Sequence, residues 1–197
     1  FIVAIVLGAA FLLLKLNAPG SGSENPALSQ EVKLSPNGRH LQFPGGSLEI
    51  PEGFDSRGQG EIEEGGWIIM FGHGYKKSGG LSAMLSVAFR DTPKSFKQLQ
   101  GDTTRQKLKS YALDYSMQEV GGDSYVQDRV TTTYISHAPT ARMDWHGVKR
   151  GKKVEGVNFF LASNSRLYTI ILVDFSQFGA KHLDQAVESV ENIELVE

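Results

Sequence analysis

The run LYTIILVDF at residues 167–175 constrains the fold of this 197-residue chain more than any other segment. A strand with one face in water alternates apolar and polar residues, because successive side chains point to opposite faces. In this run both the odd-numbered and the even-numbered positions are mainly apolar. We therefore predict that it forms a strand in the middle of a sheet, with a layer of structure packed on each face.

Alternating segments elsewhere predict the neighbouring strands. Residues 67–75 and 81–89 carry apolar side chains at every second position, and residues 77–80 between them read KSGG, which is typical of a β-hairpin. Shorter strand signals occur at 31–34, 39–43, 47–50, 115–120, 125–136, 142–146 and 154–162, and 193–196 is able to pair as an edge.

Two segments carry helix signals. Thr92 followed by Pro93 is a favourable helix start, so a helix is expected from residue 94 to about 111, with a break or kink at Gly101. Ser176 can cap a final helix that has an apolar stripe of Leu183, Ala186, Val187 and Val190. Many strands joined by hairpins, with only two helices, predict an α+β domain. Its antiparallel sheet would be flanked by helices as an α/β/α sandwich, unlike a doubly wound nucleotide fold.

The N-terminal segment, residues 1–16, predicts one transmembrane or signal-anchor helix. Its first fourteen residues carry no charge, and at 1.5 Å per residue they cover about two thirds of a bilayer core. We expect further residues upstream, because the chain begins at Phe1. The residues expected to contact lipid are Phe1, Ile2, Val3, Ile5, Val6, Leu7, Phe11, Leu12, Leu13 and Leu14. A cleaved signal peptide and a buried core helix are the alternatives, and 16–18 (LNA) is a poor cleavage site.

Residues 17–30 have the composition of a flexible linker, rich in Gly, Ser, Pro and Asn. The soluble domain is then expected to cover residues 31–197. This order predicts a single-pass membrane protein, in a bacterial inner membrane with the C-terminal domain in the periplasm.

Composition narrows the function. A net charge of -2 disfavours nucleic acid as a partner, since binders of phosphate usually show an excess of Lys and Arg. The absence of cysteine excludes disulfides, thiolate metal sites and a cysteine nucleophile.

The known catalytic and cofactor motifs are absent from the sequence. The phosphate-loop, dinucleotide, zinc-protease and α/β-hydrolase patterns do not occur, so we predict no catalytic, cofactor or metal residues and no enzyme activity. His73 lies on the same face of its predicted strand as the apolar residues, and we interpret it as a hydrogen-bonded core residue. In 144–146 (DWH), a structural Trp with exposed Asp and His is expected. The acidic triplet Glu61, Glu63 and Glu64 is expected in a solvated loop, with a calcium contact as the alternative.

The densest charge feature is a basic cluster around Gly151, which comprises Lys149, Arg150, Lys152 and Lys153. As a hairpin turn it would be solvated and would discourage edge pairing. The functional alternative is contact with an anionic surface, either lipid headgroups or an acidic partner.

Two segments resemble the PsbP/Mog1/DcrB-like family of α/β/α sandwiches. Residues 43–54 read FPGGSLEIPEGF, where Pro51, Gly53 and Phe54 match a "Pro-x-Gly-aromatic" strand start. Residues 165–195 contain Leu167 and Tyr168 of a "Leu-Tyr" core strand that leads into a C-terminal helix. The resemblance covers about residues 40–197 and implies a non-enzymatic accessory role. The chain departs from the lipoprotein branch in lacking a lipidated cysteine.

The leading functional hypothesis is therefore a membrane-anchored accessory or assembly subunit that binds a partner protein of a membrane or envelope complex. The alternative is an envelope domain that binds a small ligand or lipid, on the evidence of the aromatic residues Trp67, Phe71, Tyr75 and Phe89. A hydrolase with a Ser or His site built by the fold is the third hypothesis.

Overall fold

The computed structural model describes residues 32–62, 66–74, 81–93, 96, 101–122, 124–163, 165–175 and 181–196. The predicted anchor and linker, residues 1–30, lie outside these ranges, as do Glu63, Glu64, Tyr75 and the KSGG turn. Within the described ranges, no helix combines the length and the apolar composition that a membrane span requires.

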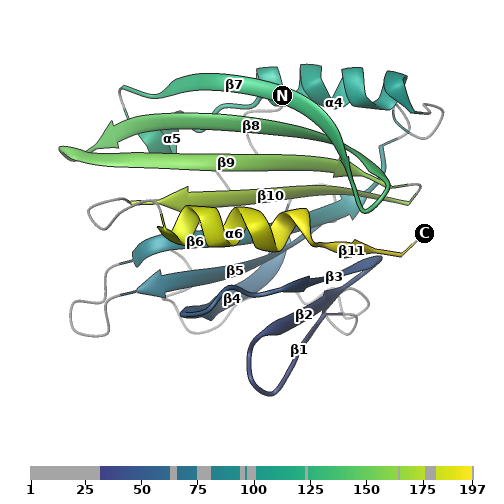
Figure 1. Ribbon diagram of the computed structural model, residues 1–197, viewed down its shortest axis with the longest axis horizontal. Helices are drawn as coiled ribbons and strands as arrows, with labels where there is room; N and C mark the ends of the chain where they lie inside the picture. Colours follow the sequence, from purple (N-terminus) through teal and green to yellow (C-terminus); the bar gives the residue numbers. More distant parts are fainter. Residues whose placement is uncertain are drawn as a thin grey trace.

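The core of the fold is a seven-stranded antiparallel sheet in the order β4-β5-β6-β10-β9-β8-β7 (Figure 1). β10 (Arg166–Asp174) is its middle strand, as predicted, and pairs with β6 along one side and β9 along the other. The remaining strands are β4 (Phe54–Ile62), β5 (Gly66–Gly74), β6 (Leu81–Asp91), β7 (Val126–Ile135), β8 (Ala138–Lys149) and β9 (Lys152–Ala162).

A second, four-stranded sheet has the order β1-β2-β3-β11. It contains β1 (Lys33–Leu34), β2 (His40–Phe43), β3 (Gly46–Glu49) and β11 (Glu194–Leu195). The pairing of β11 with β3 confirms that the C-terminal tail forms an edge.

Layers cover both faces of the large sheet. On one face, α6 (Lys181–Glu191) and the small sheet enclose a core that includes Leu48, Ile170 and Val190. On the other face, α4 (Asp102–Asp114) and the one-turn α5 (Gln118–Gly121) cover a second core. The structure thus confirms the predicted antiparallel sheet flanked by helices, and it adds the small sheet.

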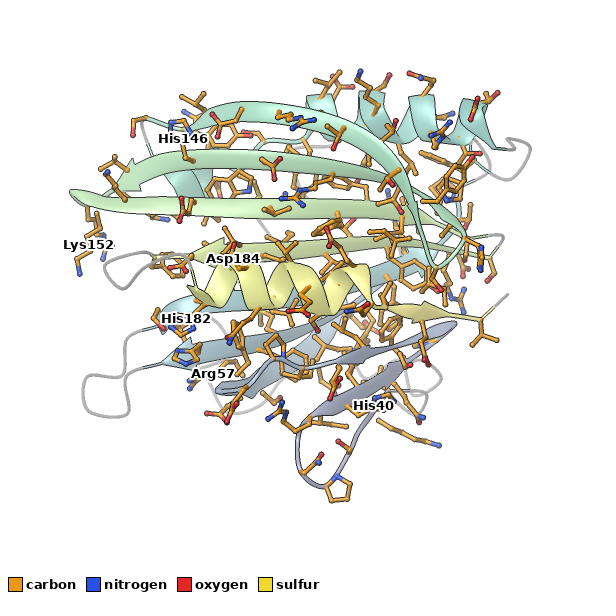
Figure 2. All side chains as sticks on the ribbon, in the orientation of Figure 1. His40, Arg57, His146, Lys152, His182 and Asp184 are labelled. Atoms are coloured by element: carbon orange, nitrogen blue, oxygen red, sulfur yellow. The ribbon has the colours of Figure 1, made fainter. Side chains whose placement is uncertain are left out.

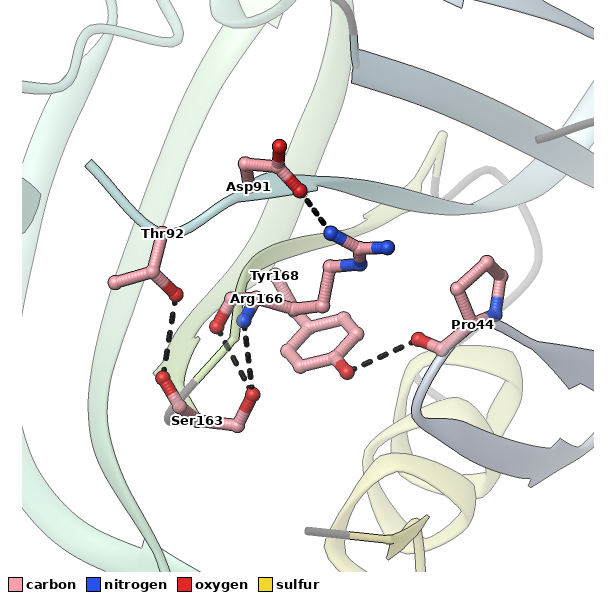
Figure 3. Close-up of polar contacts among 6 residues, drawn as sticks. All are labelled: Pro44, Asp91, Thr92, Ser163, Arg166 and Tyr168. Carbon is pink, nitrogen blue, oxygen red and sulfur yellow. Dashed lines mark hydrogen bonds and ion pairs between the residues drawn. The ribbon is translucent and has the colours of Figure 1, made fainter. Parts of the chain in front are cut away.

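At the start of β10, one polar contact joins the two sheets and others connect neighbouring strands of the large sheet (Figure 3). The buried Tyr168 hydroxyl donates to the Pro44 carbonyl at 3.1 Å. Nearby, the Arg166 guanidinium forms an ion pair with Asp91, and Thr92 donates to the Ser163 carbonyl at 3.2 Å. The Leu-Tyr motif therefore fixes the turn between β2 and β3 onto the central strand.

Two sequence expectations were wrong. The predicted strand at 115–120 is an irregular segment followed by α5, and its apolar alternation arises because Tyr115 and Met117 both insert into the α4-side core. The strand β4 was missed because its sequence, FDSRGQGEI, is polar and contains two glycines. Glu61 consequently lies in a strand rather than a loop. The predicted helix over residues 94–111 is observed as α4, which begins only after Gly101, where φ is 53°, and most of residues 94–100 lie outside the described ranges.

Candidate functional site

The four residues of the basic cluster lie at the tip of the β8–β9 hairpin, as predicted. The two-residue turn, Arg150-Gly151, has positive φ at both positions, 53° and 74°. Turns of this kind favour Asn-Gly or Asp-Gly, and an Arg in left-handed conformation costs on the order of 1 kcal/mol. We call Lys149, Arg150, Lys152 and Lys153, with the turn between the strands, the basic hairpin.

The strand register brings like charges together in the basic hairpin. Lys149 lies directly opposite Lys152, and Lys153 lies opposite Val148. Directly opposed like charges destabilise a sheet. Arg150, Lys152 and Lys153 are exposed, and the Lys149 ammonium donates to the Glu119 carbonyl of α5. The fold therefore keeps several cations in solvent at a position where directly opposed like charges are unfavourable.

Three exposed apolar side chains lie on β8, on β7 and at the end of α4, at the end of the domain that carries the basic hairpin. Val148 is 43% exposed, Val126 is 47% exposed and Leu113 is 54% exposed. Gln127 donates its amide to the Ala112 carbonyl at 3.4 Å, which holds the end of α4 beside the start of β7. This corner of the domain thus offers positive charge with apolar patches, a combination that suits an anionic surface.

A second group of polar residues crosses the same end of the sheet. Five residues on neighbouring strands lie in one row across the sheet. His73 of β5 lies opposite Ala83 of β6, and Ala83 lies opposite Asp174 of β10. Asp174 lies opposite Glu155 of β9, and Glu155 lies opposite His146 of β8. Directly paired residues share a face, so this row faces the α6 side. Figure 2 shows His146, Lys152 and His182 together at this end of the molecule.

His73 is enclosed by residues from three other elements. A register shift in the β5–β6 pairing, after His73, turns the Ser82 hydroxyl toward it, and Ser82 Oγ lies 2.8 Å from His73 Nδ1. The same Ser82 hydroxyl lies 3.0 Å from the His73 backbone carbonyl, which can accept its hydrogen bond. The ring packs edge-on against Phe54 and stacks on His182 with centroids 3.9 Å apart.

These surroundings explain the lowered pKa of His73. Burial lowers its pKa, the neighbouring His182 lowers it further, and Asp55 raises it. The prediction of a hydrogen-bonded histidine is confirmed, although the side chain is only half-buried.

Gly53 of the family-like motif lies against the same histidine. It has φ 81°, and a Cβ at this position would approach the His73 ring to 2.6 Å. The motif residue is therefore required by local packing.

Asp174 is a buried ionisable residue that sequence reasoning missed. Its side chain is fully buried, and no donor among the described residues forms a hydrogen bond of normal length and angle with either carboxylate oxygen. Burial raises its pKa to about 6, and His182 opposes the increase, while Glu155 adds to it. The backbone N–H of Leu183 in α6 also favours the charged form, and Asp184 disfavours it. An Asp that ends a doubly buried strand is the sequence signal that would have identified it.

The remaining sequence candidates are structural or exposed. Trp145 is buried and donates to Asn158 at 3.0 Å, which confirms the interpretation of a structural Trp. His146 is exposed and pairs with Asp128, whereas Asp144 is half-buried beside Arg142. Among the described side chains, no group of three or more His, Asp or Glu is arranged to hold a metal ion.

The aromatic residues that suggested a ligand pocket belong to the core. Trp67, Phe71 and Phe89 are at most 5% exposed and pack in the α6-side cluster. A small cavity on the other face, lined by residues such as Tyr111, Tyr115 and Ile68, has a volume of about 20 Å³. That volume holds about one water molecule.

No family model and no curated protein matches this sequence. Among solved structures, similarity is found to PsbP from Synechocystis sp. PCC 6803, with TM-score 0.49 and 6% identity over 90% of this chain and 98% of that chain. LpqN of Mycobacterium tuberculosis, involved in cell envelope biogenesis, has TM-score 0.46 and 10% identity over 91% and 100%. A structure from Bacteroides thetaiotaomicron has TM-score 0.47 and 11% identity, covering 85% of this chain and 48% of that chain. This chain thus spans about half of the Bacteroides structure. A PsbP is among the similar structures, and membership of the PsbP/Mog1/DcrB-like family stays a prediction.

Proposed function

We propose that this protein is a membrane-anchored, non-catalytic accessory subunit whose soluble domain binds a partner protein through the basic hairpin. The observation that supports the proposal is the concentration of locally unfavourable choices at that hairpin. Arg150 occupies a left-handed position, and Lys149 lies opposite Lys152. Residues that break local rules without a gain in stability cluster at functional sites.

The chemistry of the basic hairpin defines the partner. Four cations on one turn attract an acidic surface and accelerate encounter with it. Val148 and Val126 supply exposed apolar area beside the charges. The partner surface would therefore be acidic with a small apolar patch.

The N-terminal segment indicates where the partner would be found. An apolar helix at residues 1–16, followed by a linker at 17–30, would hold the domain near one membrane. We propose the bacterial inner membrane, with the domain in the periplasm. Protease added to spheroplasts should then degrade the domain, and a protected domain would contradict this location.

Charge-matched variants test the binding proposal. The test variant replaces all four cations of the basic hairpin by Gln, and the control replaces four exposed cations on other elements, Lys33, Arg39, Arg57 and Lys109. Full-length tagged protein is purified from native membranes, and co-purifying proteins are quantified. We expect the test variant to lose its partner at least tenfold and the control to retain it.

Two outcomes would contradict the proposal. Equal partner recovery by both variants would show that the basic hairpin is not the binding surface. Loss of binding to phosphatidylserine vesicles, with partner recovery unchanged, would assign the hairpin to lipid headgroups instead. A urea unfolding curve for each variant verifies that both are folded.

A further inference from the structure

The two edges of the large sheet are guarded differently. A free strand edge exposes unpaired backbone N–H and C=O groups, and proteins protect it with charges, prolines or bulges. The outer strand β4 has two of these devices, since it carries the charges of Asp55 and Arg57 and shifts register after Ser56. The opposite edge is β7, the outermost strand in Figure 1.

The charges and the bulge that β7 itself carries are confined to its first part, and the Arg105 guanidinium of α4 lies over the Tyr134 ring near its end, 4.7 Å from the ring centroid. A bulge between Gln127 and Arg129 brings the charges of Asp128 and Arg129 to the first part. The following segment, residues 130–135, reads VTTTYI and has no charge, glycine or proline. It pairs with β8 without interruption, and Thr133 and Tyr134 are exposed. β-Branched and aromatic residues of this kind are the best strand formers.

We propose that residues 130–134 of β7 pair antiparallel with the same residues of a second copy of this chain, about a twofold axis at Thr132. In such a pair, directly opposed residues share a face, so the axis must pass through a residue position. Thr132 then opposes itself, Thr131 opposes Thr133, and Val130 opposes Tyr134. Thr–Thr and aromatic–β-branched pairs each contribute roughly 0.2–1 kcal/mol in antiparallel sheets.

The segment is therefore complementary to itself, and this identifies a second copy as its occupant. The pairing would create one continuous sheet across the two copies. Residues 130–134 lie toward the end of β7 that is farther from the basic hairpin. The nearer end is Val126, which lies opposite His146 on β8, close to the hairpin. Both surfaces can therefore be occupied at once.

The layers on the two faces leave room for this dimer. α4 packs mainly over β8 and β7, so the two α4 helices would lie over the two β8 strands. These strands would be three spacings apart, which is about 14 Å. Packed helices need only 8–10 Å between axes. On the opposite face, α6 packs over β10, β6 and β9, away from the new junction.

A single-cysteine experiment tests the register directly, because the chain has no cysteine. In Thr132→Cys, the two Cα atoms would be about 4.5–5.5 Å apart, within the range for a disulfide. The control is Gln59→Cys, an exposed position on the other edge strand. Under mild oxidation, we expect T132C to form a covalent dimer at least ten times faster than Q59C. Equal rates would overturn the proposal.

A second experiment measures association without a cross-link. Sedimentation of the wild type over a concentration series should show mass rising toward a dimer. Thr132→Lys places two ammonium groups at the axis and should remain monomeric, whereas Gln59→Lys should behave as the wild type. A wild type that is monomeric at every concentration, or a T132K variant that is folded and still dimeric, would refute the proposal.

Discussion

The buried carboxyl group of Asp174 leads to a prediction that runs against the usual effect of core substitutions. Its pKa of about 6 in the folded protein compares with 3.8 for the free side chain. Each unit of difference corresponds to about 1.36 kcal/mol, so burial of the charged form costs up to about 3 kcal/mol. We expect the variant Asp174→Asn, which has the same shape and no charge, to lose this cost.

The sign follows from the direction of the shift. A folded pKa raised above the unfolded value means that the folded protein binds more protons between the two values. The contribution of Asp174 to the free energy of unfolding is therefore most favourable below pH 3.8, and it is lost as the pH rises through about 6. The linkage relation places about 2 kcal/mol of this loss between pH 4.5 and pH 8.

Urea unfolding of the wild type and of Asp174→Asn at both pH values measures the effect. The stability of the variant relative to the wild type should increase by about 2 kcal/mol from pH 4.5 to pH 8. Comparing the two differences cancels any fixed effect of exchanging a carboxylic acid for an amide. Asp114→Asn, at an exposed carboxylate on α4 that forms no ion pair with a histidine among the described residues, is the control and should show no such change. A relative stability of D174N that stays constant or decreases with pH would refute the reasoning.

Three further measurements test the contacts of His73 and the hydrogen bond between Tyr168 and Pro44. Gly53→Ala should cost about 1–3 kcal/mol more than Gly38→Ala in urea unfolding, because both have positive φ but only at Gly53 would the new methyl group come within 2.6 Å of a ring, that of His73. Equal losses of stability would contradict this. Tyr168→Phe should cost about 1 kcal/mol through loss of the bond to Pro44, whereas the exposed Tyr134→Phe should be nearly neutral, and a neutral Y168F would argue against that bond. Burial is the larger cause of the lowered pKa of His73, and the charge of His182 is the second, so His182→Gln should raise the pKa of His73 in an NMR titration; an unchanged value would exclude the coupling.

Patterns within single segments were sufficient to predict most of the sheet. The doubly apolar run placed β10 in its centre, and alternation identified β5, β6, β7 and β9. The strand β4 gave no such signal, because an edge strand is held by backbone hydrogen bonds that its side chains do not encode. At 115–120 the same rule failed, since Tyr115 and Met117 reach the core from an irregular segment.

The basic hairpin was predicted as a turn from its residues alone, because the charges and Gly151 are adjacent in the sequence. The opposition of Lys149 and Lys152 became visible only with the strand register. His73 and His182 are 109 positions apart, so no local pattern predicts their contact.

The sequence by itself determined the elements and the chemistry that each one carries: the central strand, the charged turn and the uncharged half of β7. The tertiary structure decided which of these meet. It stacked His182 on His73, buried Asp174 at the start of α6 and left β7 at an edge. The reason is that periodicity reports how one segment divides its side chains between core and solvent. Long-range pairing depends instead on register and on the order of strands, which are properties of the whole sheet.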